Sequence, residues 1–116
     1  MRCVVQYFPA LHPPLLQLSI HHAPHRRMHI ASIQRYREDL RKALSAAAVP
    51  MPIGHPIDLS VLFVNPSSPD LDNLLTALYQ ALDGATLRAP GILEDDGLIS
   101  KVTASKYFPG DRKSVV

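Results

Sequence analysis

The sequence predicts a single α+β domain in which α-helices flank a small mixed β-sheet. Apolar residues recur at helical spacing in residues 32–48 and again in 71–82, whereas residues 57–64 alternate in the way a strand does. Strands and helices that follow one another in this order are typical of a mixed sheet with helices packed against it. A chain of 116 residues supports one hydrophobic core of modest size, so we expect one domain over residues 1–116.

The first half of the chain contains one predicted strand, one loop and one helix. Residues 3–8 are a β-prone run that stops at Pro9, which predicts the first strand. Residues 10–29 hold three prolines and five of the six histidines without a sustained period, which predicts a long loop. The helix expected over 32–48 has Ser32 as its N-cap and ends before Pro50.

The second half contains the predicted central strand. Residues 57–64 are apolar on both faces in their second half, as a strand inside a sheet is. The helix that follows carries a leucine stripe and is expected to close at Gly84. Another strand is predicted over 98–107, and residues 112–116 could add only a short extension.

Composition excludes several classes of protein. Cys3 is the only cysteine, so neither an intramolecular disulfide nor a cysteine-based zinc site is available, which fits a reducing cytoplasm. No apolar run reaches the roughly 20 residues that a membrane-spanning helix needs, so we expect no membrane partner. A formal charge of +2 means that any nucleic-acid affinity must come from a local basic patch.

Two acidic motifs are the main indication of function. Asp70-Leu71-Asp72-Asn73 opens the second helix, and Glu94-Asp95-Asp96 precedes the last predicted strand. If these turns lie at adjacent strand ends, the carboxylates meet, and such a cluster is stable only when Mg²⁺ or Mn²⁺ neutralises it. Each motif also has a simpler interpretation, because acids at a helix start cap backbone N–H groups and the second motif suits a solvated turn.

These motifs resemble those of the RusA-type Holliday junction resolvases, a family of small phage-associated endonucleases. The resemblance rests on Asp70-Leu71-Asp72-Asn73-Leu74, on Ala81-Leu82 with Gly84, and on Glu94-Asp95-Asp96 followed by Ile99. A fainter similarity covers Pro13-Pro14 and the segment from Arg27 to Tyr36-Arg37. The resemblance to this family implies a homodimer that nicks four-way DNA junctions in recombination and repair, using Mg²⁺ or Mn²⁺.

The resemblance also implies roles for particular residues. Asp70, Asp72 and Asp96 correspond to the catalytic, metal-binding acids, with Asp95 or Glu94 in support. The family has a catalytic lysine four residues after the second aspartate, where this chain has Thr76, and Lys101 or Arg88 are the candidates to replace it. Thr76 leaves a second possibility open, namely a degenerate or non-catalytic member of the family that binds DNA without cutting it.

Contacts to DNA are expected from the basic loop and from the last strand. Arg26 and Arg27 are the best candidates, because the guanidinium binds phosphate in a forked geometry at every relevant pH. His29 and Lys101 complete the predicted DNA-binding set. The alternative is a basic loop that is merely solvated.

Overall fold

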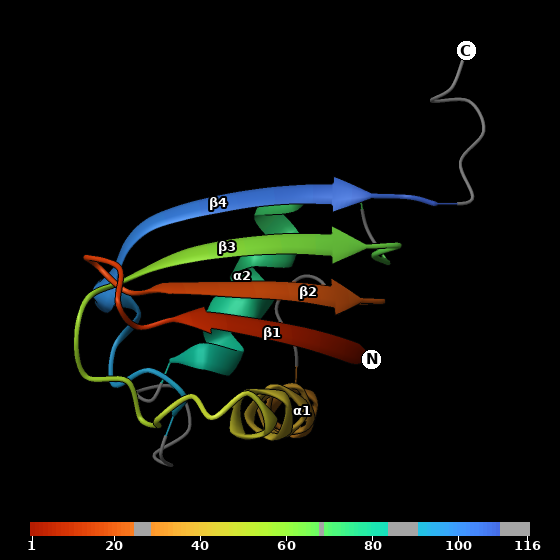
Figure 1. The fold of residues 1–116 in the computed structure, drawn as a ribbon. Helices are drawn as coiled ribbons and strands as arrows, with labels where there is room; N and C mark the ends of the chain where they lie inside the picture. The colour runs from red at the N-terminus through yellow and green to blue at the C-terminus, as the bar shows by residue number, and fades with distance from the viewer. Residues whose placement is uncertain (25–28, 68, 84–90, 110–116) are drawn as a thin grey trace.

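The computed structural model of the protein describes residues 1–24, 29–67, 69–83 and 91–109. Within these residues, two α-helices accompany a four-stranded sheet whose strand order is β1-β2-β3-β4 (Figure 1). In chain order the elements are β1 (Arg2–Phe8), β2 (Leu15–His21), α1 (Ile30–Ala46), β3 (Ile57–Val64), α2 (Leu71–Leu82), the 3-10 helix η2 (Asp96–Leu98) and β4 (Ile99–Tyr107). The sheet is mixed, which confirms the predicted α+β class.

The strand directions decide which residues meet at each edge of the sheet. β1 pairs with β2 in an antiparallel manner, whereas β2, β3 and β4 are parallel to one another (Figure 1). A parallel pair needs a crossover that returns the chain to the opposite edge, and α2 provides it between β3 and β4. The chain therefore enters α2 at one edge of the sheet and enters β4 from the other.

β2 corrects the prediction of a continuous loop over residues 10–29. Leu16, Leu18 and Ile20 are buried, and the residues between them are half-buried, which is the two-residue period of a strand. The prolines and histidines around this short run hid its alternation. β2 lies between β1 and β3. β3 in turn lies between β2 and β4, so it is an interior strand as predicted.

One hydrophobic core joins the sheet to both helices. The inward side chains of β2 and β3 pack with the apolar faces of α1 and α2, and the predicted core residue Tyr36 is almost fully buried. In Figure 1, α2 passes behind the sheet and α1 lies beside β1. The other face of the sheet carries exposed or half-buried residues, of which Gln6, Gln17, Ser60 and Thr103 form one row across all four strands.

The helix ends differ from the predicted ones by a few residues. α1 begins at Ile30, so the predicted N-cap Ser32 lies inside its first turn. The N-cap is His29, whose side chain makes no capping hydrogen bond. The helix closes with Ala48 at φ 59°, where the Val49 N–H donates to the Leu44 carbonyl at 3.0 Å, which is a Schellman arrangement. α2 ends at Leu82, with Asp83 as its C-cap.

Gly84 and residues 112–116 lie outside the described residues. None of the described helices has both the length and the hydropathy needed to span a membrane.

Candidate functional site

Asp70 caps the N-terminal end of α2. Its Oδ1 accepts a hydrogen bond from the backbone N–H of Asp72 at 3.0 Å, and its Oδ2 accepts one from the Asn73 side-chain amide at 3.1 Å. Asp72 follows in the first turn, with an exposed side chain. The first acidic motif therefore does what acids at a helix start commonly do: it satisfies N–H groups that have no partner within the helix.

Thr76 lies one turn beyond Asp72 on the same face of α2. Its Oγ1 donates a hydrogen bond to the Asp72 carbonyl oxygen at 2.8 Å, a bond within the helix. The hydroxyl is thus occupied locally, and the side chain carries no charge toward the surface.

Asp96 reaches this face of α2 from η2. It lines a shallow hollow of about 260 Å³ together with Thr76, Tyr79, Gln80 and Asp83. Four of these five residues recur along α2 and its C-cap at helical spacing, so one face of the helix forms the floor of the hollow. The second acidic motif is therefore brought beside the helix that the first motif opens.

Electrostatic repulsion is concentrated at Asp96. Burial raises the pKa of the Asp96 carboxyl, and the nearby charges of Asp83 and Asp95 raise it further. The pKa of the Tyr79 phenol is also raised, first by burial and then by the charge of Asp96. Negative charge thus gathers at the C-terminal end of α2, where the helix dipole is also negative.

The three predicted ligands do not form a ready-made metal cage. Among the residues that the structure describes, no group of three His, Cys, Asp or Glu side chains could hold a metal ion. The expectation of adjacent strand ends fails because β3 and β4 are parallel, so the turn after β3 and the turn before β4 lie at opposite edges of the sheet. Asp70 marks one end of α2, and Asp96 lies along its second half.

The two supporting acids have local roles. The Asp95 Oδ1 accepts the backbone N–H of Gly97 at 3.0 Å and so caps η2, whereas Glu94 is exposed beside Gly54. The donors therefore fit a cation held by one or two carboxylates together with phosphate oxygens, which is the usual manner of Mg²⁺ in phosphoryl-transfer sites. They do not fit a cage made of protein ligands alone.

Lys106 is a cation near the first acidic motif that sequence reasoning missed. Its Nζ donates to the carbonyl oxygen of Pro69, the residue before Asp70. The parallel pairing places the end of β4 beside the end of β3 and hence beside the start of α2. Lys101, by contrast, stands opposite Asp58 near the beginning of β4 and is exposed.

The predicted DNA-binding loop is described only in part. Arg26 and Arg27 lie outside the described residues, as does Arg88, the other proposed substitute for the lysine. His29 is exposed at the N-cap of α1, and His21 ends β2, where its ring lies 3.3 Å from the Arg2 guanidinium.

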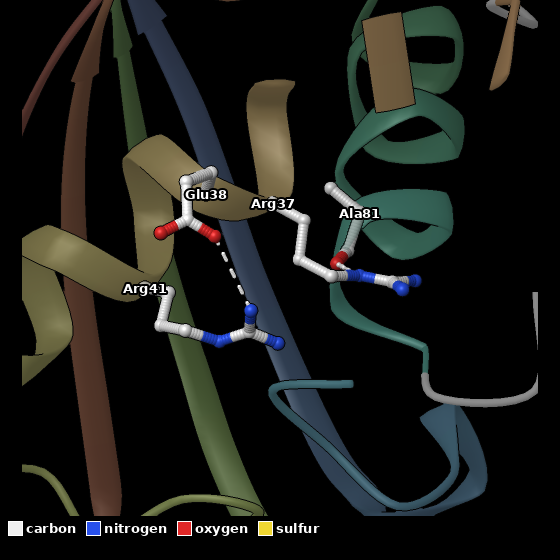
Figure 2. Close-up of polar contacts among 4 residues, drawn as sticks. All are labelled: Arg37, Glu38, Arg41 and Ala81. Carbon is white, nitrogen blue, oxygen red and sulfur yellow. Dashed lines mark hydrogen bonds and ion pairs between the residues drawn. The ribbon is translucent and has the colours of Figure 1, made fainter. Parts of the chain in front are cut away.

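Arg37 binds the C-terminal end of α2, a role that its position in the sequence does not predict. Its side chain is 3% exposed and extends from α1 to α2 (Figure 2). Its Nε donates to the Ala81 carbonyl at 2.8 Å, and its Nη2 donates to the carbonyls of Gln80 at 3.2 Å and Asp83 at 2.6 Å. Its sequence signals were its place beside the core residue Tyr36 and in the segment of fainter similarity to the resolvases, and neither indicates contacts with α2.

Comparison with models of protein families, with curated proteins and with solved structures gives no match.

Proposed function

We propose that this protein is a metal-dependent endodeoxyribonuclease that nicks four-way DNA junctions, acting in recombination and repair in a reducing cytoplasm. The observation that carries the proposal is that Asp96 and Thr76 line one hollow on α2, and that Thr76 lies one helical turn from Asp72. Acids that crowd on one surface repel one another, and a divalent cation relieves that repulsion. The resemblance of both motifs to those of the RusA-type resolvases supplies the substrate class.

The residues on and beside α2 have distinct roles in the proposed reaction. Asp72 and Asp96 would hold Mg²⁺ or Mn²⁺ together with the DNA phosphates, while Asp70 orients the start of α2 through its two accepted hydrogen bonds. When bound, the cation supplies the Lewis acidity that phosphodiester hydrolysis requires. Lys106 offers the Asp70 end an ammonium group that can meet a phosphate, a role that Thr76 cannot fill.

A homodimer completes the proposal. A four-way junction has near two-fold symmetry, so a C₂ dimer that presents two acidic surfaces can make paired cuts. Arg26, Arg27, His29 and Lys101 remain the candidates for contacts with the arms of the junction.

The second candidate function is DNA binding without cutting. Thr76 favours it, because its hydroxyl bonds to the backbone of its own helix and contributes no positive charge. Removing one preorganised electrostatic group typically costs 10²- to 10³-fold in rate, so a chain without the lysine can bind a junction and still turn over very slowly.

A nicking assay separates these two functions. A synthetic four-way junction and a linear duplex of the same sequence are incubated with the protein and Mg²⁺ or Mn²⁺, and junction binding is measured in parallel. We expect nicks in the junction only, and we expect Asp72→Asn to abolish them while binding is kept or strengthened, because one negative charge near the phosphates is lost. Asp58→Asn, in β3 opposite Lys101, is the matched control and should cut normally.

Equal loss of binding and cutting in Asp72→Asn would mean that Asp72 maintains the fold. Junction binding without nicks in either metal supports the second candidate, and absence of both binding and nicking refutes both functions.

A further inference from the structure

Arg37 has an unusual position for a charged residue. It is the one buried charged side chain among the described residues, and three main-chain carbonyls around the last turn of α2 accept its N–H groups. Its Nη1 is buried as well and has no hydrogen-bond partner among the described residues. Burying a guanidinium costs free energy, and the hydrogen bonds to the end of α2 indicate what offsets that cost.

We propose that Arg37 is a positioning residue for the acidic hollow: its guanidinium fixes the end of α2 from which Asp83 projects and to which the segment carrying Asp96 is attached. The inference rests on the proposed function, because Asp96, which lines this hollow, is one of the two carboxylates proposed to hold the divalent cation.

The attachment of the Asp96 segment to α2 runs through the main chain. Asp83 and Leu93 form a parallel bridge, and the Leu93 N–H donates to the Leu82 carbonyl at 2.9 Å. On its other side, the Glu94 N–H donates to the Ile53 carbonyl at 3.0 Å. The chain that leads to Asp96 is therefore held by the last residues of α2, whose carbonyls Arg37 binds.

Charge supports the same role. The C-terminal end of a helix carries partial negative charge, and Asp83 and Asp96 add two carboxylates there. A buried cation bonded to the Asp83 carbonyl offsets part of this repulsion from below, on the side away from solvent. Arg41, one turn further along α1, instead pairs with Glu38 at 3.3 Å near the surface, so it shares the charge of Arg37 but not its contacts (Figure 2).

The forked shape of arginine predicts which variants fail. A lysine at this position keeps the charge but offers one compact ammonium group, which cannot reach carbonyls that the Nε and Nη2 atoms of arginine bind at separate points. Arg37→Lys therefore tests the geometry, Arg37→Met tests the charge as well, and Arg41→Met is the matched control on the same helix.

Two measurements by NMR on the full-length protein test the inference at a temperature where each variant is folded. Amide hydrogen exchange should accelerate at Asp83, Leu93 and Glu94 in Arg37→Lys, while the amides of β2 and β3 keep their protection. Titration with Mn²⁺ in the presence of a four-way DNA junction, whose phosphates complete the proposed cation site, should broaden the wild-type signals of Thr76, Tyr79 and Gln80. The midpoint should rise about 10- to 100-fold in Arg37→Lys, as for residues that orient metal ligands indirectly. Arg41→Met should match the wild type in both.

The outcomes separate this inference from the proposed function. Equal Mn²⁺ midpoints in the wild type and Arg37→Lys would refute the positioning role and leave the nuclease proposal intact. A higher Mn²⁺ midpoint in Arg37→Lys, in a protein that never nicks a junction, would support the positioning role and refute the nuclease. A wild type that Mn²⁺ does not broaden at any of these signals refutes the inference, whatever the exchange rates show.

Discussion

The first acidic motif opens α2, Asp96 of the second lies beside its C-terminal half, and the two ends of the helix are built in contrasting ways. At the N-terminal end, Asp70 binds the backbone of Asp72 and the side chain of Asn73, and both of these partners lie within three residues in the sequence. At the C-terminal end, Arg37 binds carbonyls that are more than forty residues away, and Asp96 approaches from beyond the crossover. A local end can be identified from the sequence, whereas a long-range end depends on the fold.

The contrast also separates two uses of negative charge. Near Asp70 the carboxylate meets the positive end of the helix dipole and stabilises it. Near Asp83 and Asp96 the carboxylates add to the negative end, and the charge of Arg37 attracts that of Asp83 only. The first arrangement is favourable without any ligand, whereas the second would gain from a bound cation.

The largest expected effect belongs to Thr76, which lies between the two ends. Thr76→Lys should raise the nicking rate about 10²- to 10³-fold if a missing ammonium group limits turnover, because position 76 returns to the face of Asp72. The increase should appear in kcat far more than in junction affinity, since the charge acts mainly on the transition state. Single-turnover nicking with Mg²⁺ and with Mn²⁺ measures it.

Lys106→Gln is the companion variant. A wild type that is already active, unchanged by Thr76→Lys and disabled by Lys106→Gln would show that the ammonium near Pro69 has taken over the role. If neither the wild type nor Thr76→Lys cuts branched DNA, the α2 surface is not a nuclease site.

The next effect concerns the free energy of unfolding. Arg37→Met should lower it by about 3 kcal/mol, because three buried or partly buried carbonyls at the end of α2 lose a charged donor. Removal of the buried cation offsets only part of that loss. Arg41→Met, whose side chain is 34% exposed, should change it by less than about 0.5 kcal/mol. Urea denaturation measures both, and similar losses in the two variants would remove the contrast between the ends of α2.

A smaller loss is expected at the opposite end. Asp70→Ala should cost about 1 kcal/mol, the usual value for removing an N-cap, while Asp70→Asn should cost little because asparagine caps equally well. Equilibrium unfolding at pH 7 in the presence of EDTA gives both numbers. A large loss in Asp70→Asn would instead indicate that the negative charge itself matters at this end.

The smallest expected effect depends on pH. The pKa of Asp96 is raised in the folded protein, so the ionised carboxylate is less favourable there than in the unfolded chain, and its cost is present once the pH exceeds the folded pKa. Asp96→Asn should therefore increase stability slightly at pH 7, by no more than about 0.5 kcal/mol for so exposed a residue, and the gain should vanish below about pH 4. Thermal unfolding in EDTA over this pH range measures it, and a gain that persists at pH 3 would contradict the electrostatic explanation.

These features explain how much of the molecule the sequence predicts. Local periods located both helices and β3 within a few residues, because such periods come from burial against a single core. β1 and β4 were located by their β-prone composition instead. β2 was missed because a strand between prolines and histidines has too few residues to show its period. Arg37 was missed because its partners lie on another helix, and nothing around position 37 in the sequence indicates them.

The position of Asp96 needed information that local patterns do not contain. Two acidic motifs that flank a crossover fall at one edge of the sheet if the strands are antiparallel and at opposite edges if they are parallel. Only the pairing of β3 with β4 decides this, and that pairing is parallel.

The uncovered face of the sheet has a consequence for how freely the sequence can vary. Because the described helices pack on one side only, positions in β1, β2 and most of β3 alternate between one that the core constrains and one that meets solvent. Ser60, between the buried Leu59 and Val61, is an example. A library of all single substitutions across β2 and β3 should show a two-residue period. Polar replacements should be accepted at positions such as Gln17 and Ser60 and rejected at their neighbours. The number of folded variants at each position would then identify the face of the sheet that packs against the helices.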